Sequence, residues 1–257
     1  MMRRLTIILL FSLYCIGASA QYARDTVSLG SSFKGTQLIA PAVFGASGAA
    51  VHFLWHDSIE LPVHDFTSAG GNVNPLVYQS GNYFRYVPAV AHLGLGLTGV
   101  KSRHAFLDRS LESAISYFFG LGSGFVLKKL IYSPRPDGSG NDSFPSGHTI
   151  ISVIGSELIR MDYGWGWGAG AYALSGMVAY SRLYSDVHWL GDILAGTGLG
   201  ILSAHVGGWM LEPVKRWFNI PDVSWDGLGG ASKATVAIAP YYDPLSRSYA
   251  ASLALRF

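Results

Sequence analysis

Three short polar clusters interrupt the apolar stretch between residues 128 and 192, and their residue types suit the chemistry of a phosphate group. The clusters are Lys128 with Arg135-Pro136, then Pro145-Ser146-Gly147-His148, and then Ser181-Arg182 with His188 and Asp192. Lys128, Arg135 and Arg182 are cations in apolar surroundings, where an unpaired charge is costly. A phosphate would satisfy them, because guanidinium groups donate in pairs to its oxygens. We therefore predict that these three cations bind phosphate.

The second cluster precedes an apolar segment that we expect to form a helix entered from Gly147. Free backbone N–H groups at the start of a helix bind anions, and a glycine lets the anion approach closely. The Ser146 hydroxyl adds one more donor. Ser146 and Gly147 are therefore predicted to complete the phosphate-binding group.

His188 and Asp192 are four residues apart, which puts them on one face of a helix. Asp192 can then accept the Nδ1 proton of His188, which leaves Nε2 with a free lone pair. His188 would attack phosphorus and form a phosphohistidine, while the cations stabilise the developing charge. His148, when protonated, would donate to the leaving oxygen and later activate water. We expect no metal ion or other cofactor, because the cations supply the charge stabilisation that Mg²⁺ gives elsewhere.

At these spacings the clusters together resemble the three-part signature of the type 2 phosphatidic acid phosphatase superfamily. The matching residues are Lys128-x6-Arg135-Pro136, Pro145-Ser146-Gly147-His148 and Ser181-Arg182-x5-His188-x3-Asp192. The resemblance covers roughly residues 85–212 and implies a helical bundle with the site at one end. It also implies the roles given above to His188, His148 and Asp192.

The order of apolar segments is, more narrowly, similar to that of bacterial membrane-bound lipid phosphatases. This likeness implies a metal-independent phosphatase that acts on a phosphate monoester or diphosphate head group of a lipid. The substrate would be a phospholipid such as phosphatidylglycerol phosphate, lipid A, or a polyprenyl diphosphate such as undecaprenyl diphosphate. Three alternatives stay open: a soluble periplasmic acid phosphatase of broad specificity, a vanadate-dependent haloperoxidase, and a non-catalytic membrane scaffold.

The composition indicates a membrane protein. Charged residues make up 13% of the chain and hydrophobic residues 49%, whereas a soluble domain carries about 25% charged residues. The 32 glycines suit the close approach of helices in a bilayer. Without Arg3 and Arg4 the chain has 16 basic and 16 acidic residues, so nothing suggests nucleic acid as a partner.

Residues 1–20 are predicted to be a secretory signal peptide. Arg3 and Arg4 precede an apolar run that closes on the small residues Ala18-Ser19-Ala20. An uncleaved first membrane helix is the alternative. The single cysteine, Cys15, lies in this segment, so we expect neither a disulfide nor a thiol nucleophile after it. These features favour a protein of the bacterial cell envelope.

The predicted fold is an all-α bundle of about six helices, in a helical phosphatase domain at residues 21–212. Six apolar segments are expected to form it, at residues 36–55, 87–100, 110–131, 149–158, 164–180 and 189–211. Several are shorter than the ~20 residues that a perpendicular membrane span requires. Turn signals at Gly70-Gly71-Asn72 and Asn74-Pro75 predict a loop over 57–86. The tail at 213–257 is expected to be a short β-hairpin or an extended segment, with a turn at 240–247.

His52 and His56 lie four residues apart near the end of the first apolar segment. A metal-binding pair is one interpretation. We favour histidines with ordinary hydrogen-bond partners, because no cysteine or glutamate completes a ligand set.

The three clusters are predicted to meet at one end of the bundle, since they lie between the third and fourth and between the fifth and sixth segments. The opposite end holds six basic residues: Lys101, Arg103, Arg109, Arg160, Lys215 and Arg216. By the positive-inside rule that end is cytoplasmic, so we expect an inner-membrane protein whose active site faces the periplasm. A cleaved signal followed by six full spans would place the site inside instead. Three explanations would resolve this conflict. Residues 36–55 do not cross the membrane, the bundle begins at a different segment, or the protein is soluble or peripheral in the periplasm.

Overall fold

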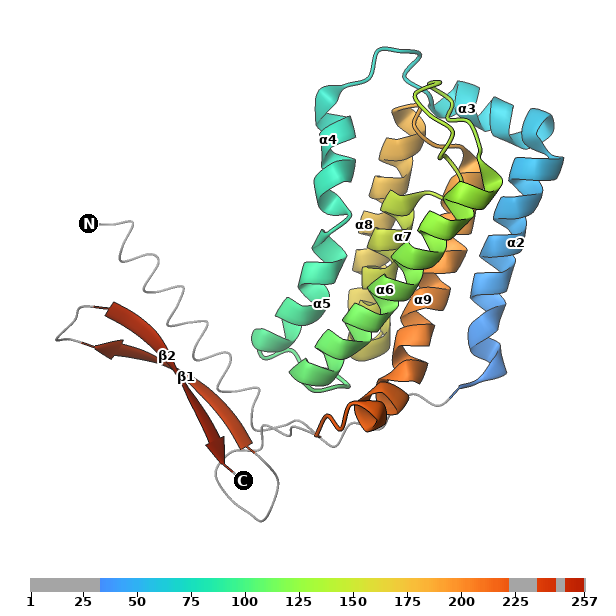
Figure 1. Cartoon of the computed structure of the whole chain (residues 1–257). Coiled ribbons are helices and arrows are strands. Elements are labelled where there is room, and N and C mark those ends of the chain that lie inside the picture. The colour runs from blue at the N-terminus through green and yellow to red at the C-terminus, as the bar shows by residue number, and fades with distance from the viewer. Residues whose placement is uncertain (1–32, 222–234, 244–247, 257) are drawn as a thin grey trace.

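The computed structural model describes residues 33–221, 235–243 and 248–256, so the predicted signal peptide lies outside the described residues. The part of the chain from 33 to 221 contains eight α-helices, one 3-10 turn and one π turn (Figure 1). In chain order they are η1 (Gly35–Leu38), α2 (Ile39–Leu54), η2 (His56–Glu60), α3 (Leu61–Thr67), α4 (Pro75–Phe84), α5 (Val87–Leu97), α6 (Phe106–Ile131), α7 (Gly147–Tyr163), α8 (Trp165–Tyr184) and α9 (Leu190–Trp217). The all-α prediction is confirmed for the bundle.

The prediction of a loop over 57–86 is wrong, and this segment accounts for the helices beyond the expected six. It contains the π turn η2 and the helices α3 and α4. Asn74 caps α4, because its side chain accepts a hydrogen bond from the backbone N–H of Leu76 at 2.9 Å. Gly70 and Gly71 have φ angles of 57° and 82° and form the turn between α3 and α4. The turn signals therefore mark a turn that joins two short helices, and not a long loop.

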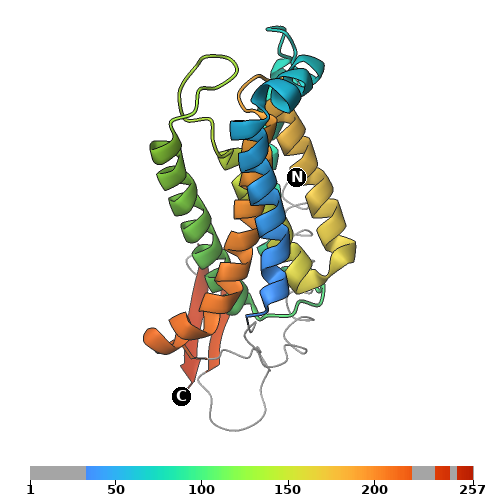
Figure 2. The ribbon, with the colours of Figure 1, turned by 90° about the vertical axis from the view of Figure 1, so that its right-hand side faces the viewer.

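Helix α9 runs through the bundle and packs against α2, α6 and α7. Figures 1 and 2 show α2 and α9 side by side along their length. Gly48 makes this contact possible, because a Cβ there would lie 2.4 Å from the backbone N of Ala195 in α9. The two helices thus approach to backbone contact, which only a glycine permits at this position.

The apolar face of α7 forms the centre of the bundle. Ile150, Ile154 and Leu158 recur every four residues along this face and are fully buried against Ala204 of α9. Three partly buried side chains pack around them: Tyr117, Met161 and Leu199. This core fixes the axial position of α7, whose first residues carry the second polar cluster.

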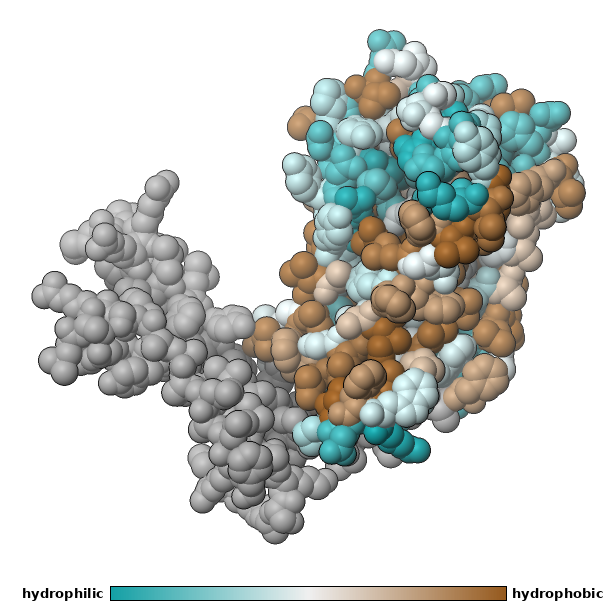
Figure 3. Space-filling view, viewed as in Figure 1, coloured by the Kyte–Doolittle hydropathy of each residue, from teal (hydrophilic) through white to brown (hydrophobic). Residues whose placement is uncertain are grey.

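Within residues 33–221, three segments of helix are long and apolar enough to cross a membrane: Gly35–Leu54, Phe106–Ile131 and Leu190–Trp217. The outer faces of the first two carry large exposed apolar side chains, such as Phe118 at 84% and Leu130 at 76% exposure. On the face shown in Figure 3, hydrophobic residues form a band across the middle of the bundle, with hydrophilic residues above and below it. A surface of this kind fits the hydrocarbon layer of a bilayer.

Two of the six basic residues predicted at the far end of the bundle are buried. Arg109 is 1% exposed and donates to the Tyr163 hydroxyl at 2.7 Å, and Lys215 pairs with Asp108 at 2.8 Å. Arg160 pairs with Glu157 at 2.6 Å. Three of the six basic residues thus have partners within the bundle.

The tail contains two strands, β1 (Thr235–Asp243) and β2 (Ser248–Arg256). They pair antiparallel in a register that runs from Thr235 opposite Arg256 to Asp243 opposite Ser248. Pro240 to Asp243, which were expected in the turn, continue β1. The connecting residues 244–247 lie outside the described residues.

Candidate active site

The helix order brings the three polar clusters to one end of the bundle. Lys128 lies in the last turn of α6, and α7 begins directly after Ser146. Arg182 lies in the last turn of α8, and Asp192 lies in the first turn of α9. Because consecutive long helices run in opposite directions, the end of one meets the start of the next.

His188 and Asp192 form a buried pair at the centre of this end. The Nδ1 atom of His188 lies 3.2 Å from Oδ2 of Asp192, and the two side chains are 3% and 0% exposed. The backbone N–H of Trp189 donates to the same oxygen at 2.8 Å, and the Ser143 hydroxyl also donates to it. Three donors thus hold one carboxylate oxygen, which fixes the orientation of the His188 ring.

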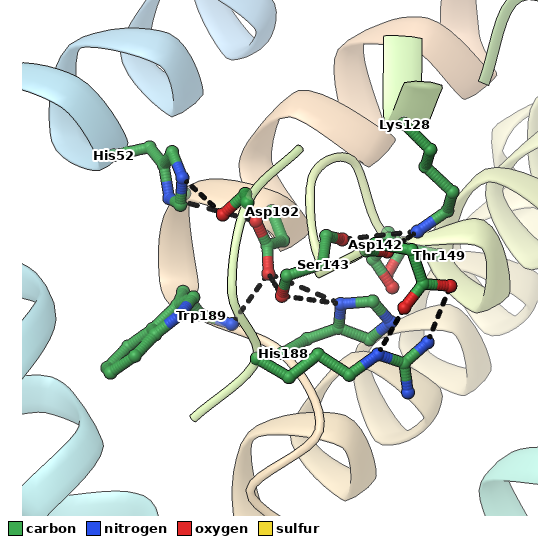
Figure 4. Close-up of polar contacts among 12 residues, drawn as sticks. His52, Lys128, Asp142, Ser143, Thr149, His188, Trp189 and Asp192 are labelled. Atoms are coloured by element: carbon green, nitrogen blue, oxygen red, sulfur yellow. Dashed lines mark hydrogen bonds and ion pairs between the residues drawn. The ribbon is translucent and has the colours of Figure 1, made fainter. Parts of the chain in front are cut away.

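The other oxygen of Asp192 faces a second histidine. Nδ1 of His52 lies 3.7 Å from Oδ1 of Asp192, and Figure 4 shows His52 and His188 on opposite sides of the carboxylate. Ser133 Oγ lies 2.8 Å from Nε2 of His52. His52 of α2 therefore lies next to the Asp192 carboxylate, on the side away from His188.

Glu60 is a buried residue behind the site that the sequence analysis missed. Its Oε2 lies 2.7 Å from Nδ1 of His56, and its Oε1 lies 3.3 Å from Nδ1 of His52. Oε1 also accepts the backbone N–H of Gly191, at the start of α9, at 2.7 Å. His52 and His56 thus have ordinary hydrogen-bond partners, as predicted, and one of these partners is a glutamate. The four-residue spacing of His52, His56 and Glu60 was the signal that could have found it.

Two of the predicted phosphate-binding cations lie together and share Asp142. The Lys128 ammonium donates to the backbone carbonyl of Asp142 and, at 3.3 Å, to that of Ser143. Arg135 donates through Nε and Nη2 to the two carboxylate oxygens of Asp142, at 2.8 and 3.1 Å. The guanidinium of Arg135 therefore has the two-pronged geometry that an oxyanion requires.

Ser146 and Gly147 differ in what they offer an anion. Ser146 is buried, its N–H donates to the Asp192 carbonyl at 3.0 Å, and its hydroxyl accepts from the Thr149 hydroxyl at 3.1 Å. Its amide is thus already used. Gly147 is the first residue of α7, and a Cβ there would meet no heavy atom within 4 Å. Of the two, Gly147 has the open surroundings that close approach of a ligand needs.

His148 lies among cations and not beside a carboxylate. Its Nε2 is 2.9 Å from Nη1 of Arg85, 2.9 Å from Oδ1 of Asn82 and 3.4 Å from Nη1 of Arg182. Arg182 is buried and donates through Nη2 to the Tyr78 carbonyl at 2.6 Å. Asn82 and Arg85 come from α4 and its C-cap, in the segment expected to be a loop. No short-range pattern in the sequence marked these two residues.

The two predicted catalytic histidines are both shifted towards the neutral form. Burial lowers the pKa of His188, and this outweighs the hydrogen bond to Asp192, which raises it. Burial, followed by the charges of Arg182 and Arg85, lowers the pKa of His148 to about 3. A neutral His188 suits the predicted nucleophile. A neutral His148 departs from the expectation of a histidine that is protonated before the substrate binds.

Comparison with known proteins places this site in context. Residues 109–215 match the family described as the PAP2 superfamily. A lipid A 1-phosphatase of Porphyromonas gingivalis is 30% identical over 140 residues, which are 52% of this chain; the chain spans only 31% of that relative. Among solved structures, LpxE of Aquifex aeolicus has a TM-score of 0.47 and 18% identity over 58% of this chain and 94% of that chain. A transmembrane PAP2-type phosphatidylglycerolphosphate phosphatase of Bacillus subtilis has a TM-score of 0.44 and 18% identity over 70% of this chain and 98% of that chain.

Proposed function

We propose that the protein is a membrane phosphatase that hydrolyses the phosphate or diphosphate head group of a lipid, and the match of residues 109–215 to the PAP2 superfamily supports this. The observation that carries the proposal is the buried His188–Asp192 pair, which lies next to the cations Lys128 and Arg135. An oriented, neutral imidazole next to phosphate-binding cations is the arrangement that nucleophilic phosphoryl transfer requires.

In the first step, Nε2 of His188 forms a bond to phosphorus as the bond from phosphorus to the leaving oxygen breaks. The phosphate binds Arg135 and Arg182, and it replaces the Asp142 carboxylate as the two-oxygen partner of Arg135. The leaving oxygen takes a proton from His148. In the second step water attacks the phosphohistidine and gives a proton back to His148, so the proton balance closes.

The cations around His148 connect its protonation to substrate binding. In the free protein Arg85 and Arg182 help to keep this imidazole neutral. A bound phosphate offsets both charges, which raises the pKa of His148. A monoanionic phosphate, whose second pKa is ~6, also brings the proton that His148 then passes to the leaving oxygen. We therefore infer that His148 becomes an acid only once the substrate is in place.

We propose a lipid as the substrate because the site lies at the end of an apolar band (Figure 3). Lipid A, phosphatidylglycerol phosphate and undecaprenyl diphosphate are the candidates, and the name of the relative that is 30% identical supports the first. We further propose an inner-membrane location with the site facing the periplasm, in keeping with the signal-like residues 1–20. The large exposed apolar side chains on α2 and α6 disfavour a soluble phosphatase.

Phosphate release from a panel of substrates tests this proposal. The detergent-purified protein is given lipid A, undecaprenyl diphosphate, phosphatidylglycerol phosphate and a soluble phosphomonoester. We expect kcat/KM for one lipid to exceed that for the soluble ester by at least ~10²-fold, and we expect activity to survive a brief exposure to EDTA. Equal rates on the soluble ester, together with release of the protein from membranes by a high-salt wash, would support the soluble acid phosphatase instead.

The pH dependence of kcat/KM follows from the neutral state of His188. A lowered pKa keeps the imidazole unprotonated, and hence nucleophilic, below its ordinary value of 6.5. We therefore expect the acid limb of the profile to lie below pH 6.5, once the ionisation of the substrate itself near ~6 is taken into account. The profile is measured on a lipid phosphate of known pKa. An acid limb above pH 6.5 would show that burial does not control the pKa of His188.

A further inference from the structure

A second group of buried ionisable residues lies at the end of the bundle remote from His188. It comprises His92 of α5, His104 just before α6, Glu112 of α6 and Asp162 near the end of α7, and all four side chains are 0–1% exposed. One ligand atom from each of His92, Glu112 and Asp162 lies within 4.8 Å of the others. The proposed phosphatase chemistry uses none of these residues.

Glu112 is the residue that ordinary hydrogen bonding does not explain. Among the described residues, neither of its carboxylate oxygens has a hydrogen-bond partner, and its nearest opposite charge is Nδ1 of His104 at 3.5 Å from Oε2. A carboxylate removed from water without partners is costly by several kcal/mol. The unpartnered oxygens face two histidines and a second carboxylate, which is the chemistry of a cation site.

We propose that His92, Glu112 and Asp162 bind one divalent transition-metal ion of the Zn²⁺ type. Zn²⁺ takes imidazole nitrogen and carboxylate oxygen at about 2.0–2.2 Å, which puts its ligand atoms roughly 3.4 Å apart. Nε2 of His92 and Oδ2 of Asp162 lie 2.6 Å apart and would separate slightly, while Glu112 would move inward. The ion would also balance the two carboxylate charges.

The neighbours of these residues already provide the contacts that orient metal ligands. Ser113 Oγ lies 2.9 Å from Nδ1 of His92, so an Nδ1–H···O bond leaves Nε2 free to bind the ion. Nδ1 of His104 lies 2.6 Å from Oδ1 of Asp162, so His104 holds that carboxylate with its other oxygen turned to His92. Metal binding would displace the proton that His92 now shares with Asp162.

The ion would be structural. Asp162 lies fourteen residues beyond His148 along α7, a rise of about 21 Å at 1.5 Å per residue. The ion therefore does not reach the phosphate that His188 attacks. It would instead join α5, α6 and α7 at the end of the bundle where Arg109 and Lys215 are also buried.

Metal content and thermal stability test the proposal in the full-length protein in detergent. After dialysis against micromolar Zn²⁺ and removal of the excess, we expect about one Zn²⁺ per chain in the wild type and less than about one tenth in Glu112→Gln. Glu157→Gln is the matched control, because Glu157 is a buried α7 carboxylate outside the group, and it should retain the ion. Zn²⁺ should raise the Tm of the wild type by roughly 5 °C or more, and should not raise that of Glu112→Gln.

If the buried group does not bind a metal ion, the same experiments give different results. If the group is only a set of ion pairs with protonated histidines, the wild type binds no Zn²⁺ and its Tm does not respond to Zn²⁺, and this outcome overturns the proposal. If Glu112→Gln does not fold, the wild type alone decides the question. Loading with Co²⁺ should then give visible absorption bands, and their absence would likewise overturn the proposal.

Discussion

His188→Ala is expected to reduce kcat by about 10⁴-fold or more and to leave the fold intact. In the proposed mechanism His188 supplies the nitrogen that bonds to phosphorus, and the described part of the site offers no second neutral imidazole that is held by a carboxylate next to the predicted phosphate-binding cations. His52 contacts the other oxygen of Asp192 and lies on the far side of that carboxylate from His188 (Figure 4). An alanine therefore removes the nucleophile without a replacement.

Trapping the phosphohistidine intermediate would show that His188 is the residue that is phosphorylated. With a ³²P-labelled lipid, an acid-labile and alkali-stable label should appear on the wild-type chain and be absent from His188→Ala. His205→Gln is the matched control, because His205 is a buried histidine that pairs with Glu157 far from the site, and it should retain both label and turnover. Full turnover in His188→Ala, or a label that survives in it, would refute the phosphohistidine mechanism.

Asp192→Asn is expected to reduce kcat by about 10³- to 10⁴-fold, with KM changed much less. With its oxygen in the place of Oδ2, the asparagine can still accept from the Trp189 N–H, the Ser143 hydroxyl and Nδ1–H of His188, so the local structure is preserved. The substitution removes the negative charge of the carboxylate, however. That charge would stabilise the positive charge that develops on the imidazole as Nε2 bonds to phosphorus in the proposed mechanism.

Ser143→Ala provides the graded comparison for Asp192→Asn. It removes one of the three donors to Oδ2 of Asp192 but leaves the charge and the tautomer of His188 unchanged. We expect a loss of about 10-fold or less in kcat. Steady-state kinetics of both variants, with circular dichroism to verify folding, separate the two effects. Equal losses in Asp192→Asn and Ser143→Ala would mean that Asp192 acts through position alone.

The long helices and the three clusters were predictable because their signals are local. The apolar face of α7 recurs every four residues, and His188 and Asp192 are separated by one helical turn. The structure places both of them, together with Lys128, Arg135, His148 and Arg182, at one end of the bundle. Their catalytic and binding roles stay predictions, which the variants above address.

The residues that support the site were not predictable, because distant parts of the chain bring them there. Glu60 bonds to the backbone of Gly191, and Asn82 and Arg85 reach His148 across more than sixty positions of sequence. Short, turn-rich helices such as α3 and α4 have too few residues for a clear period. The burial of Arg109 and Lys215 was not predictable for the same reason, because the partners that permit it belong to other helices.

The position of the site at the end of the apolar band has a consequence for how the protein meets its substrate. The proposed lipid substrate would stay in the layer that surrounds the apolar band, so encounters would take place in two dimensions and only the head group would have to reach His188. The concentration that governs the rate is then the mole fraction of the lipid in the bilayer or micelle. Dilution of the substrate with inert detergent slows turnover even when the bulk amount of substrate is unchanged.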